Sequence, residues 1–326
     1  FAIRGTVKEI KPFGNGHINR TFYVETTSNK YVLQSINTYA FPDVDMLMSN
    51  INIVSSHLRN KDYKTLAVIC TKKGGLYTKE GHHCYRLFSY VDKSVCHEEL
   101  SNLETIRKAS EAFGELHSQL FDLDSSLIQE VIPDFHNTPK RYENFIQAVN
   151  KDKENRLSTC LEEVNKYKSF ADKLDLIVNG LEDGSINKSI IHNDPKINNV
   201  LFDEETDNVK GVIDLDTVMP GSVLYDFGDA LRSLFTGANE DSEDLSKLTV
   251  NEDIYKAYLT GYYKKMGDKL NQKEISLLPY SVFLLSLECG MRFLEDYLRG
   301  DVYFYTKYPT HNLVRSRTQL TLAIDI

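Results

Sequence analysis

The sequence predicts an α+β fold of two lobes, in which a small lobe rich in β-strands precedes a larger helical lobe. Three observations support this prediction. The chain has 326 residues, and at about 150 residues per domain this length predicts two units. Short β-branched and aromatic runs dominate residues 1–90, whereas residues 91–326 mainly have helical spacing. A polar connector at 89–93 separates the two parts.

The first 90 residues predict an antiparallel sheet and one helix. Turn-forming residues separate the short apolar runs, which is typical of hairpins. The segment 44–58 instead has apolar residues at helical spacing, so it predicts a helix between the second and third strands. The predicted strands are 22–25, 30–34, 67–70 and 84–88.

The larger part predicts long helices with one β-rich interruption. At 189–202 and 209–215, short apolar runs enclose a polar loop that contains Pro and Asn. The most apolar stretch, 277–287, contains Pro279 and is shorter than the roughly 18 apolar residues of a membrane span, so it predicts a buried helix. The predicted helices are 98–120, 139–177, 252–266 and 272–299.

Composition excludes several classes of protein. Thirty-eight Lys and Arg against 47 Asp and Glu give a net charge of -9, which argues against nucleic-acid and anionic-membrane partners. The five cysteines form no Cys-x-x-Cys pair, and an odd number leaves one unpaired in any disulfide scheme. A cytoplasmic location is therefore expected. The sequence does not predict an oligomeric state.

The strongest chemical signal is the polar loop 192–199, which is followed after a short strand by Asp214. Phosphoryl transfer needs an oriented nucleophile and magnesium on the phosphates. Asp194 fits a carboxylate that orients a hydroxyl and takes its proton, while Asn199 and Asp214 offer the oxygen ligands that magnesium prefers. Lys196 could reach the transferring phosphoryl oxygens. Each residue alone would be assigned to a turn or cap, so the hypothesis depends on their joint spacing.

That spacing resembles the catalytic and metal-binding loops of the kinase superfamily. Because Ile-Asp-x-Asp stands in place of Asp-Phe-Gly, the chain resembles the aminoglycoside phosphotransferase and choline kinase branch. The resemblance implies a bilobal protein-kinase-like fold, with a nucleotide-binding lobe at 1–90 and a catalytic and sugar-binding lobe at 91–326. His192 is predicted to pack and hydrogen-bond so that it holds the loop, with a direct acid or base role as the alternative. Asp216 is expected to support the metal site.

A literal Asp-Phe-Gly occurs at Asp226, 27 residues beyond Asn199 and just before a helical run. Asp214 is the better metal ligand because it ends an apolar strand beside the catalytic loop. Asp226 is predicted to cap the helix and to tie it to that loop. A contact between Asp226 and the metal remains the alternative.

The nucleotide site is predicted from two glycines near the start of the chain. Gly14 and Gly16 lie in a predicted hairpin, where glycines let backbone N–H groups approach phosphates. A plain hairpin is the alternative. The resemblance places these glycines and His17 at the nucleotide, and it places the backbone of Tyr90 and Val91 at adenine.

One position departs from the superfamily. The third-strand Lys or Arg that pairs with the nucleotide phosphates would fall at Gln34, which has no charge. Either other contacts hold the nucleotide, or the chain is a ligand-binding relative without activity.

A narrower resemblance covers nearly the whole chain. Six segments are similar to the N-acetylhexosamine 1-kinases, and Gln34 belongs to that group's pattern. The implied activity is phosphorylation of the anomeric hydroxyl of N-acetylglucosamine or N-acetylgalactosamine, with ATP as co-substrate and Mg²⁺ as cofactor. The similar segments are 13–19, 32–37, 192–199, 213–221, 292–298 and 300–304.

The resemblance also assigns Arg292 and Tyr303 to the sugar. Planar polar and aromatic side chains suit a neutral sugar. The alternative is that Arg292 forms a surface ion pair, because acidic residues follow it at helical spacing. Two functional alternatives also remain: a kinase for another hydroxylated acceptor, such as an aminoglycoside, amino alcohol or different hexose, and a sugar or nucleotide sensor without activity.

Overall fold

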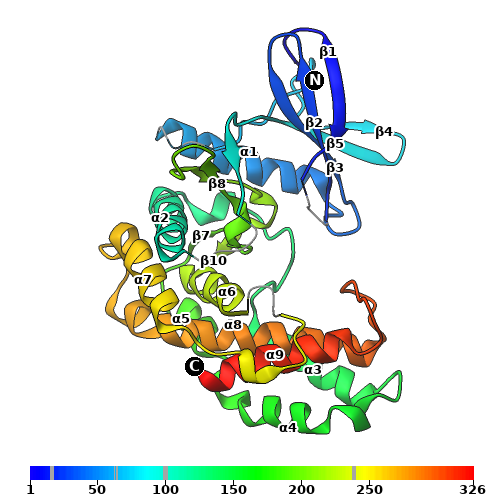
Figure 1. Cartoon of the computed structure of the whole chain (residues 1–326), viewed down its shortest axis with the longest axis vertical. Coiled ribbons are helices and arrows are strands. Elements are labelled where there is room, and N and C mark those ends of the chain that lie inside the picture. Colours follow the sequence, from blue (N-terminus) through cyan, green and yellow to red (C-terminus); the bar gives the residue numbers. More distant parts are fainter. Residues whose placement is uncertain (15–17, 62, 64, 98–101, 237–239) are drawn as a thin grey trace.

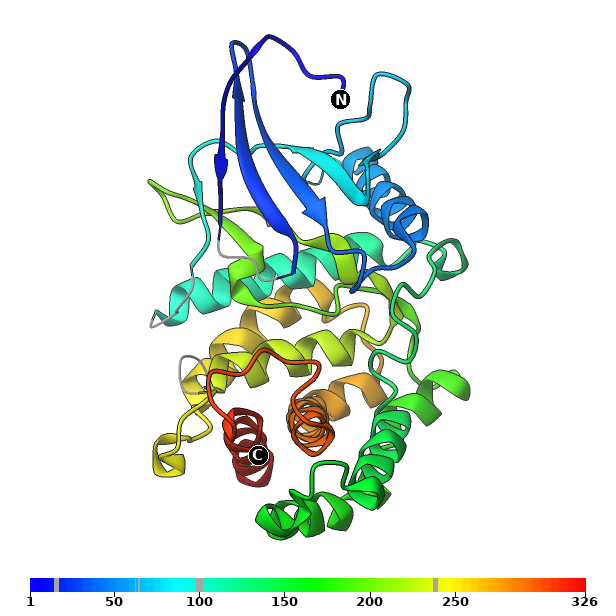
Figure 2. The same ribbon diagram turned by 90° about the vertical axis from the view of Figure 1, so that its right-hand side faces the viewer.

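The structure is a computed structural model that describes residues 1–326 except 15–17, 62, 64, 98–101 and 237–239. A lobe built on a β-sheet lies above a larger helical lobe in Figure 1, and Figure 2 shows the same two layers after a quarter turn. The predicted α+β fold with two lobes is confirmed. All five cysteines are free thiols.

The sheet of the first lobe is antiparallel, in the order β1-β2-β3-β5-β4. The strand predicted at 67–70 is wrong, because this segment forms only one bridge, Val68 to Phe88. The cause is that β4 already pairs with the first half of β5, which leaves only the far end of that edge. The elements of this lobe are β1 (Val7–Pro12), β2 (Arg20–Thr26), β3 (Lys30–Ile36), α1 (Val44–Asn60), β4 (Thr78–Glu80) and β5 (His83–Ser89).

The two faces of this sheet pack against different partners. One face buries a small cluster formed by Val24, Tyr31 and Leu87. The other face carries Ile36 and Phe88, which belong to the main core together with α1 and the helical lobe. Burial of α1 between the sheet and the second lobe therefore makes one continuous core across the two lobes.

The helices predicted at 252–266 and 272–299 are confirmed with the same bounds, as α7 and α8. The prediction of one helix over 139–177 is wrong, because Asp152 and Asn155 adopt left-handed backbone conformations that end α3. The helix predicted from residue 98 begins at Leu103, and residues 98–101 lie outside the described part of the chain. The helices of this lobe are α2 (Leu103–Leu120), α3 (Thr138–Lys151), α4 (Leu161–Ser169), α5 (Leu176–Glu182), α6 (Val223–Thr236), α7 (Glu252–Met266), α8 (Gln272–Arg299) and α9 (His311–Asp325).

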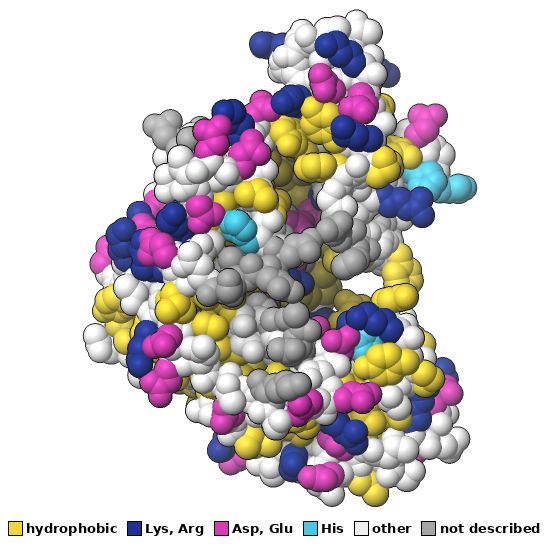
Figure 3. Space-filling view, viewed as in Figure 1, with side chains coloured by type: hydrophobic (Ala, Val, Ile, Leu, Met, Phe, Trp, Pro, Cys, Tyr) yellow, Lys and Arg dark blue, Asp and Glu magenta, His cyan; other side chains and the backbone are white. Residues whose placement is uncertain are grey.

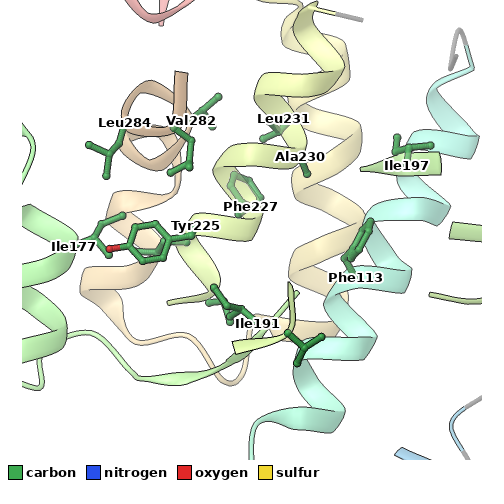
Figure 4. Packing of buried hydrophobic residues seen from close by; sticks show 14 of the residues in the cluster. Phe113, Ile177, Ile191, Ile197, Tyr225, Phe227, Ala230, Leu231, Val282 and Leu284 are labelled. Atoms are coloured by element: carbon green, nitrogen blue, oxygen red, sulfur yellow. The ribbon is translucent and has the colours of Figure 1, made fainter. Parts of the chain in front are cut away.

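Helix α8 is the central helix of the second lobe. By length and composition alone it could cross a membrane, but 67% of its most apolar window is buried inside the protein, as predicted for a core helix. Figure 4 shows Val282 of α8 on the side of Phe227 and Leu231 of α6. The two helices approach closely at Gly228, where a Cβ atom would lie 2.3 Å from the Ser281 carbonyl oxygen.

Two small sheets interrupt the helices and carry the polar loops. One sheet pairs β7 with β10, and the other has the order β6-β8-β9. The segments 192–199 and 213–218 both run between these two sheets, from β7 to β8 and from β9 to β10. The pairing of β7 with β10 and of β8 with β9 therefore brings the two segments together. These strands are β6 (Ser94–Val95), β7 (Ser189–Ile191), β8 (Val200–Asp203), β9 (Val209–Val212) and β10 (Met219–Gly221).

Candidate active site

The loop after β7 is held in place by a buried carboxylate of α6. Asp226 is 1% exposed, and its two oxygens accept the backbone N–H groups of His192, at 2.6 Å, and Asn193, at 2.8 Å. His117 of α2 contacts the same carboxylate at 2.8 Å. The structure therefore contains the predicted tie between helix and loop. The predicted capping role is wrong, because Asp226 lies inside the first turn of α6.

His192 joins the two polar loops from within the core. It is 0% exposed, and its Nε2 lies 2.9 Å from the Ile213 carbonyl oxygen. Its Nδ1 accepts the backbone N–H of Asp194 at 3.3 Å. With both ring nitrogens engaged by the backbone, His192 has the hydrogen bonds of a neutral imidazole that holds the loops together, which fits the structural role expected from the sequence.

Asp194, Asn199 and Asp214 come together at this junction. The amide nitrogen of Asn199 donates to the Asp194 carbonyl oxygen at 2.9 Å, and it lies 3.5 Å from the Asp194 carboxylate. The backbone N–H of Ile213 donates to the Asn199 carbonyl oxygen at 2.9 Å, which places Asp214 beside Asn199. Lys196 lies 2.8 Å from the other carboxylate oxygen of Asp194. The four residues form one cluster.

Asp214 is the electrostatically most unusual group in this cluster. It adopts a left-handed conformation with φ 63°. Its side chain keeps some contact with solvent, although the surrounding protein displaces much of its water. This loss of hydration, together with the carboxylates of Asp216 and Asp194, raises the pKa of Asp214 to about 7. A cation placed among these groups would relieve the repulsion.

The donor set fits magnesium held partly by phosphates. Among the described residues, no group of three His, Cys, Asp or Glu side chains could hold a metal unaided. The hydrogen bond of Asn199 uses its amide nitrogen, so its amide oxygen is the atom that a metal could take. Magnesium in proteins is usually held by one or two carboxylates together with substrate phosphates and water. Asn199 and Asp214 provide a partial set of this kind.

Asp216 faces the sheet of the first lobe. It is 5% exposed and forms an ion pair with Arg86 of β5. The distance from Nη1 to one carboxylate oxygen is 2.6 Å, and Nη2 donates to the other at 2.8 Å. The amide nitrogen of Asn19 donates to the same carboxylate at 2.7 Å. Asp216 therefore joins the loop that carries Asp214 to two segments of the first lobe.

The connector between the lobes borders a cavity of about 370 Å³. Tyr90 and Val91 line it from the connector, and Leu201 and Ile213 line it from the second lobe. Ile213 precedes Asp214, so the cavity lies next to the carboxylate cluster. In Figure 3 the surface is hollowed between the lobes. Its size and mixed lining are typical of small-molecule sites.

The predicted glycine turn is only partly described. Gly14 has φ 75°, a left-handed conformation that favours glycine. Gly16 and His17 lie outside the described residues. Phe13, at the start of this turn, lies 5.9 Å from the Tyr90 ring and 6.2 Å from the Tyr23 ring, measured between ring centroids. Aromatic contacts thus connect the turn to the connector.

Arg292 and Tyr303 lie together at the end of α8. The guanidinium carbon of Arg292 is 5.9 Å from the Tyr303 ring centroid, and it is 5.6 Å from each of the Phe135 and Phe304 centroids. Within the described part of the chain, Arg292 has no carboxylate oxygen within 4.0 Å, whereas its helical neighbour Glu295 pairs with Arg299 at 2.8 Å. The surface ion pair considered for Arg292 is therefore not formed.

The loop that carries Tyr303 is held in place by one buried carboxylate. Asp296 accepts the backbone N–H groups of Val302, Tyr303 and Phe304 at 2.9 to 3.0 Å. The Tyr303 side chain nevertheless remains 67% exposed. The backbone is fixed, while the ring contacts Arg292 and Phe304 and stays largely exposed.

The family of the chain follows from a match over most of its length. Residues 9–262, which include the carboxylate cluster, match the model of the phosphotransferase enzyme family APH. The chain belongs to this family. The predicted resemblance to the aminoglycoside phosphotransferase and choline kinase branch is thereby confirmed at the level of the family.

Solved structures share the fold of this phosphotransferase across almost the whole chain. An aminoglycoside phosphotransferase from Alicyclobacillus acidocaldarius has 11% identity and a TM-score of 0.64, covering 98% of this chain and 91% of its own. Choline kinase from Cryptosporidium parvum has 15% identity and a TM-score of 0.59, with coverage of 97% and 88%. Spectinomycin phosphotransferase, solved with ADP and spectinomycin, has 13% identity and a TM-score of 0.55, with coverage of 97% and 92%. At these identities the likeness establishes the fold alone.

Sequence reasoning missed Arg86 and the role of Asn19 in this phosphotransferase. A signal for Arg86 was present, because strand alternation puts it on the same face as Cys84 and Phe88, and a single cation on an apolar strand face needs a partner. Its partner lies 130 residues away along the chain. No local pattern could identify it.

Proposed function

We propose that this phosphotransferase transfers the γ-phosphoryl group of ATP to the anomeric hydroxyl of an N-acetylhexosamine. The observation that carries the proposal is the cluster of Asp194, Asn199 and Asp214 next to the cavity at the connector. A second observation is the contact of Arg292 with Tyr303 in the second lobe. The cluster supports phosphoryl transfer, and the contact supports a neutral acceptor.

On the nucleotide side, the cavity beside Tyr90 and Val91 would take the base. Asn199 and Asp214 would hold Mg²⁺ against the phosphates. The bound ion would offset negative charge as the phosphoryl group moves.

On the acceptor side, Asp194 would accept a hydrogen bond from the sugar hydroxyl and take its proton as the bond to phosphorus forms. Lys196 keeps this carboxylate oriented through its 2.8 Å contact. Although burial opposes it, Asp194 and then Asp229 raise the pKa of Lys196, so this side chain stays a cation that can contact phosphoryl oxygens.

The charges on the acceptor side favour a neutral substrate. A cationic acceptor needs an unpaired carboxylate or an open aromatic cage. The carboxylates of α6 and α8 already have partners, and the rings of Phe135, Tyr303 and Phe304 surround Arg292. The pairs are Asp229 with Arg232, Glu288 with His136 and Thr138, and Glu295 with Arg299.

The test is an acceptor panel with ATP and Mg²⁺: N-acetylglucosamine, N-acetylgalactosamine, an aminoglycoside and choline. We expect product from an N-acetylhexosamine only, with NMR showing the phosphate on the anomeric carbon, and no product when EDTA removes the metal. Product from the aminoglycoside or choline alone would contradict the substrate assignment and would favour a kinase for another hydroxylated acceptor. ATP binding with neither turnover nor Mg²⁺ dependence would favour the sensor that Gln34 suggested.

A further inference from the structure

The uncharged third-strand residue has a charged partner on the next strand. Gln34 on β3 lies directly opposite Arg86 on β5. The Gln34 amide oxygen accepts from Arg86 Nε at 2.9 Å, and its amide nitrogen donates to Thr21 Oγ1 at 3.1 Å. Both ends of the Gln34 amide are therefore used inside the sheet, where they orient the Arg86 guanidinium.

Arg86 has little freedom to move. Its side chain is 1% exposed, and it lies over the Phe88 ring with 5.1 Å between guanidinium carbon and centroid. Both terminal nitrogens face the Asp216 carboxylate, at 2.6 and 2.8 Å. A guanidinium that faces a carboxylate with two nitrogens fixes direction as well as distance. Arg86 thus holds β5 in one position relative to the loop that carries Asp214.

The same carboxylate also holds Asn19, the residue before β2. Asn19 donates to Asp216 at 2.7 Å through its amide nitrogen, and its amide oxygen accepts the Asn37 backbone N–H at 3.0 Å. Asn19 and β5 are bonded directly to Asp216, two positions beyond Asp214, and the segment after β3 is connected to it through Asn19. The Arg86 guanidinium, paired with Asp216, also brings a positive charge from the first lobe to within two positions of Asp214 along the chain.

We propose that Arg86 is a positioning residue for the nucleotide, which supplies from β5 the positive charge that Gln34 does not supply from β3. Through Asp216 it keeps Asn19, β5 and the Asp214 loop at the spacing that a magnesium-bound triphosphate requires. This inference rests on the proposed nucleotide site and deepens it.

The experiment moves the positive charge from β5 to the opposite position on β3. We compare Arg86→Gln, Arg86→Lys and the double variant Gln34→Lys/Arg86→Gln, and we measure affinity for Mg²⁺-ADP by calorimetry and KM for ATP. Arg86→Gln should weaken both by about tenfold or more, because small displacements in such sites have large effects. Arg86→Lys should weaken nucleotide binding less than Arg86→Gln does. The double variant should recover most of the loss, since it returns a cation to the same face of the sheet.

Two further variants distinguish a positioning role of Arg86 from a general loss of structure in the sheet. Lys79→Gln removes an exposed charge from β4 of the same sheet and should leave nucleotide affinity unchanged. Asp216→Asn keeps the shape of the anchor without its charge and should weaken affinity as Arg86→Gln does, which keeps the test valid if Arg86→Gln fails to fold. Folding is checked by thermal melting.

Two results would overturn the inference. One is unchanged Mg²⁺-ADP affinity in folded Arg86→Gln or Asp216→Asn, and the other is a folded double variant no better than Arg86→Gln. Calorimetry needs no acceptor, so these results are distinguishable from failure of the proposed function. If the native protein phosphorylates no acceptor but binds Mg²⁺-ADP in an Arg86-dependent manner, the kinase proposal fails while the positioning role stands.

Discussion

The two lobes contribute to the candidate site in different ways. In the second lobe, the loop at 192–199 is fixed by nearby core residues such as Asp226 and His192, which are at most 1% exposed. In the first lobe, the contacts with the site come from Asn19, just before β2, and from Arg86 of β5, and both meet at one carboxylate, Asp216. The second lobe therefore holds its site residues by local burial, whereas the first lobe depends on pairing between residues far apart in the chain.

This difference also decides what could be predicted from sequence. Asp194, Asn199 and Asp214 lie within 21 positions of one another, and the pairing of short strands brings such neighbours together. Their cluster was therefore accessible to motif reasoning. Arg86 and Asp216 are far apart in the chain, and their contact depends on the arrangement of the lobes.

The largest expected effect is at the proposed chemical centre of the second lobe. Asp194→Asn keeps the size of the side chain but removes the proton acceptor, so kcat should fall about 10²- to 10⁴-fold. Mg²⁺-ADP affinity and the melting temperature should stay near those of the native protein. Steady-state kinetics, calorimetry and thermal melting provide the measurements. Near-normal turnover would reject Asp194 as the base.

The next effect concerns the stability of the second lobe. Asp226→Ala leaves the N–H groups of His192 and Asn193 without partners in the core, so the free energy of unfolding should fall by about 3–5 kcal/mol. The matched control is Asp124→Ala, which removes an exposed carboxylate that accepts one backbone N–H and should cost about 1 kcal/mol. Urea denaturation measures both. Equal losses of unfolding free energy in the two variants would show that Asp226 stabilises the protein no more than the exposed cap Asp124 does.

A smaller effect is expected at the contact between α6 and α8. Gly228→Ala would press a methyl group against the Ser281 carbonyl oxygen, and overpacking of this kind costs about 1–3 kcal/mol. Ser233→Ala, on the same helix but only partly buried, should change stability by less than about 0.5 kcal/mol. Denaturation curves that do not differ between the two variants would argue against close helix contact at Gly228.

The smallest effect is expected at the acceptor. Arg292→Lys keeps the charge but loses the planar group that lies among three rings. Loss of that contact should raise KM for the N-acetylhexosamine about tenfold, with KM for ATP unchanged, since such contacts contribute about 1 kcal/mol or somewhat more. A parallel change in both KM values would assign Arg292 to general stability of the lobe.

The fold could be predicted where burial follows a simple period. The bounds of α7 and α8 were correct because their apolar residues recur at helical spacing. The sequence pattern did not predict helix α9, because polar residues such as Asn312, Ser316 and Gln319 occupy its buried face. Strand β1 was not predicted either, because all six of its residues are exposed and show no alternation of buried and exposed positions.

That exposed strand has a consequence for the protein in solution. The outer edges of a β-sheet can recruit strands from other molecules and so begin aggregation. Here one edge is β1, which carries Lys8 and Lys11, ends at Pro12 and has a register irregularity between Val7 and Glu9. The other edge is β4, which has only three residues, Lys79 among them. Charge, proline, irregular register and short length all oppose edge-to-edge pairing, so the sheet can present both edges to water without recruiting a second copy.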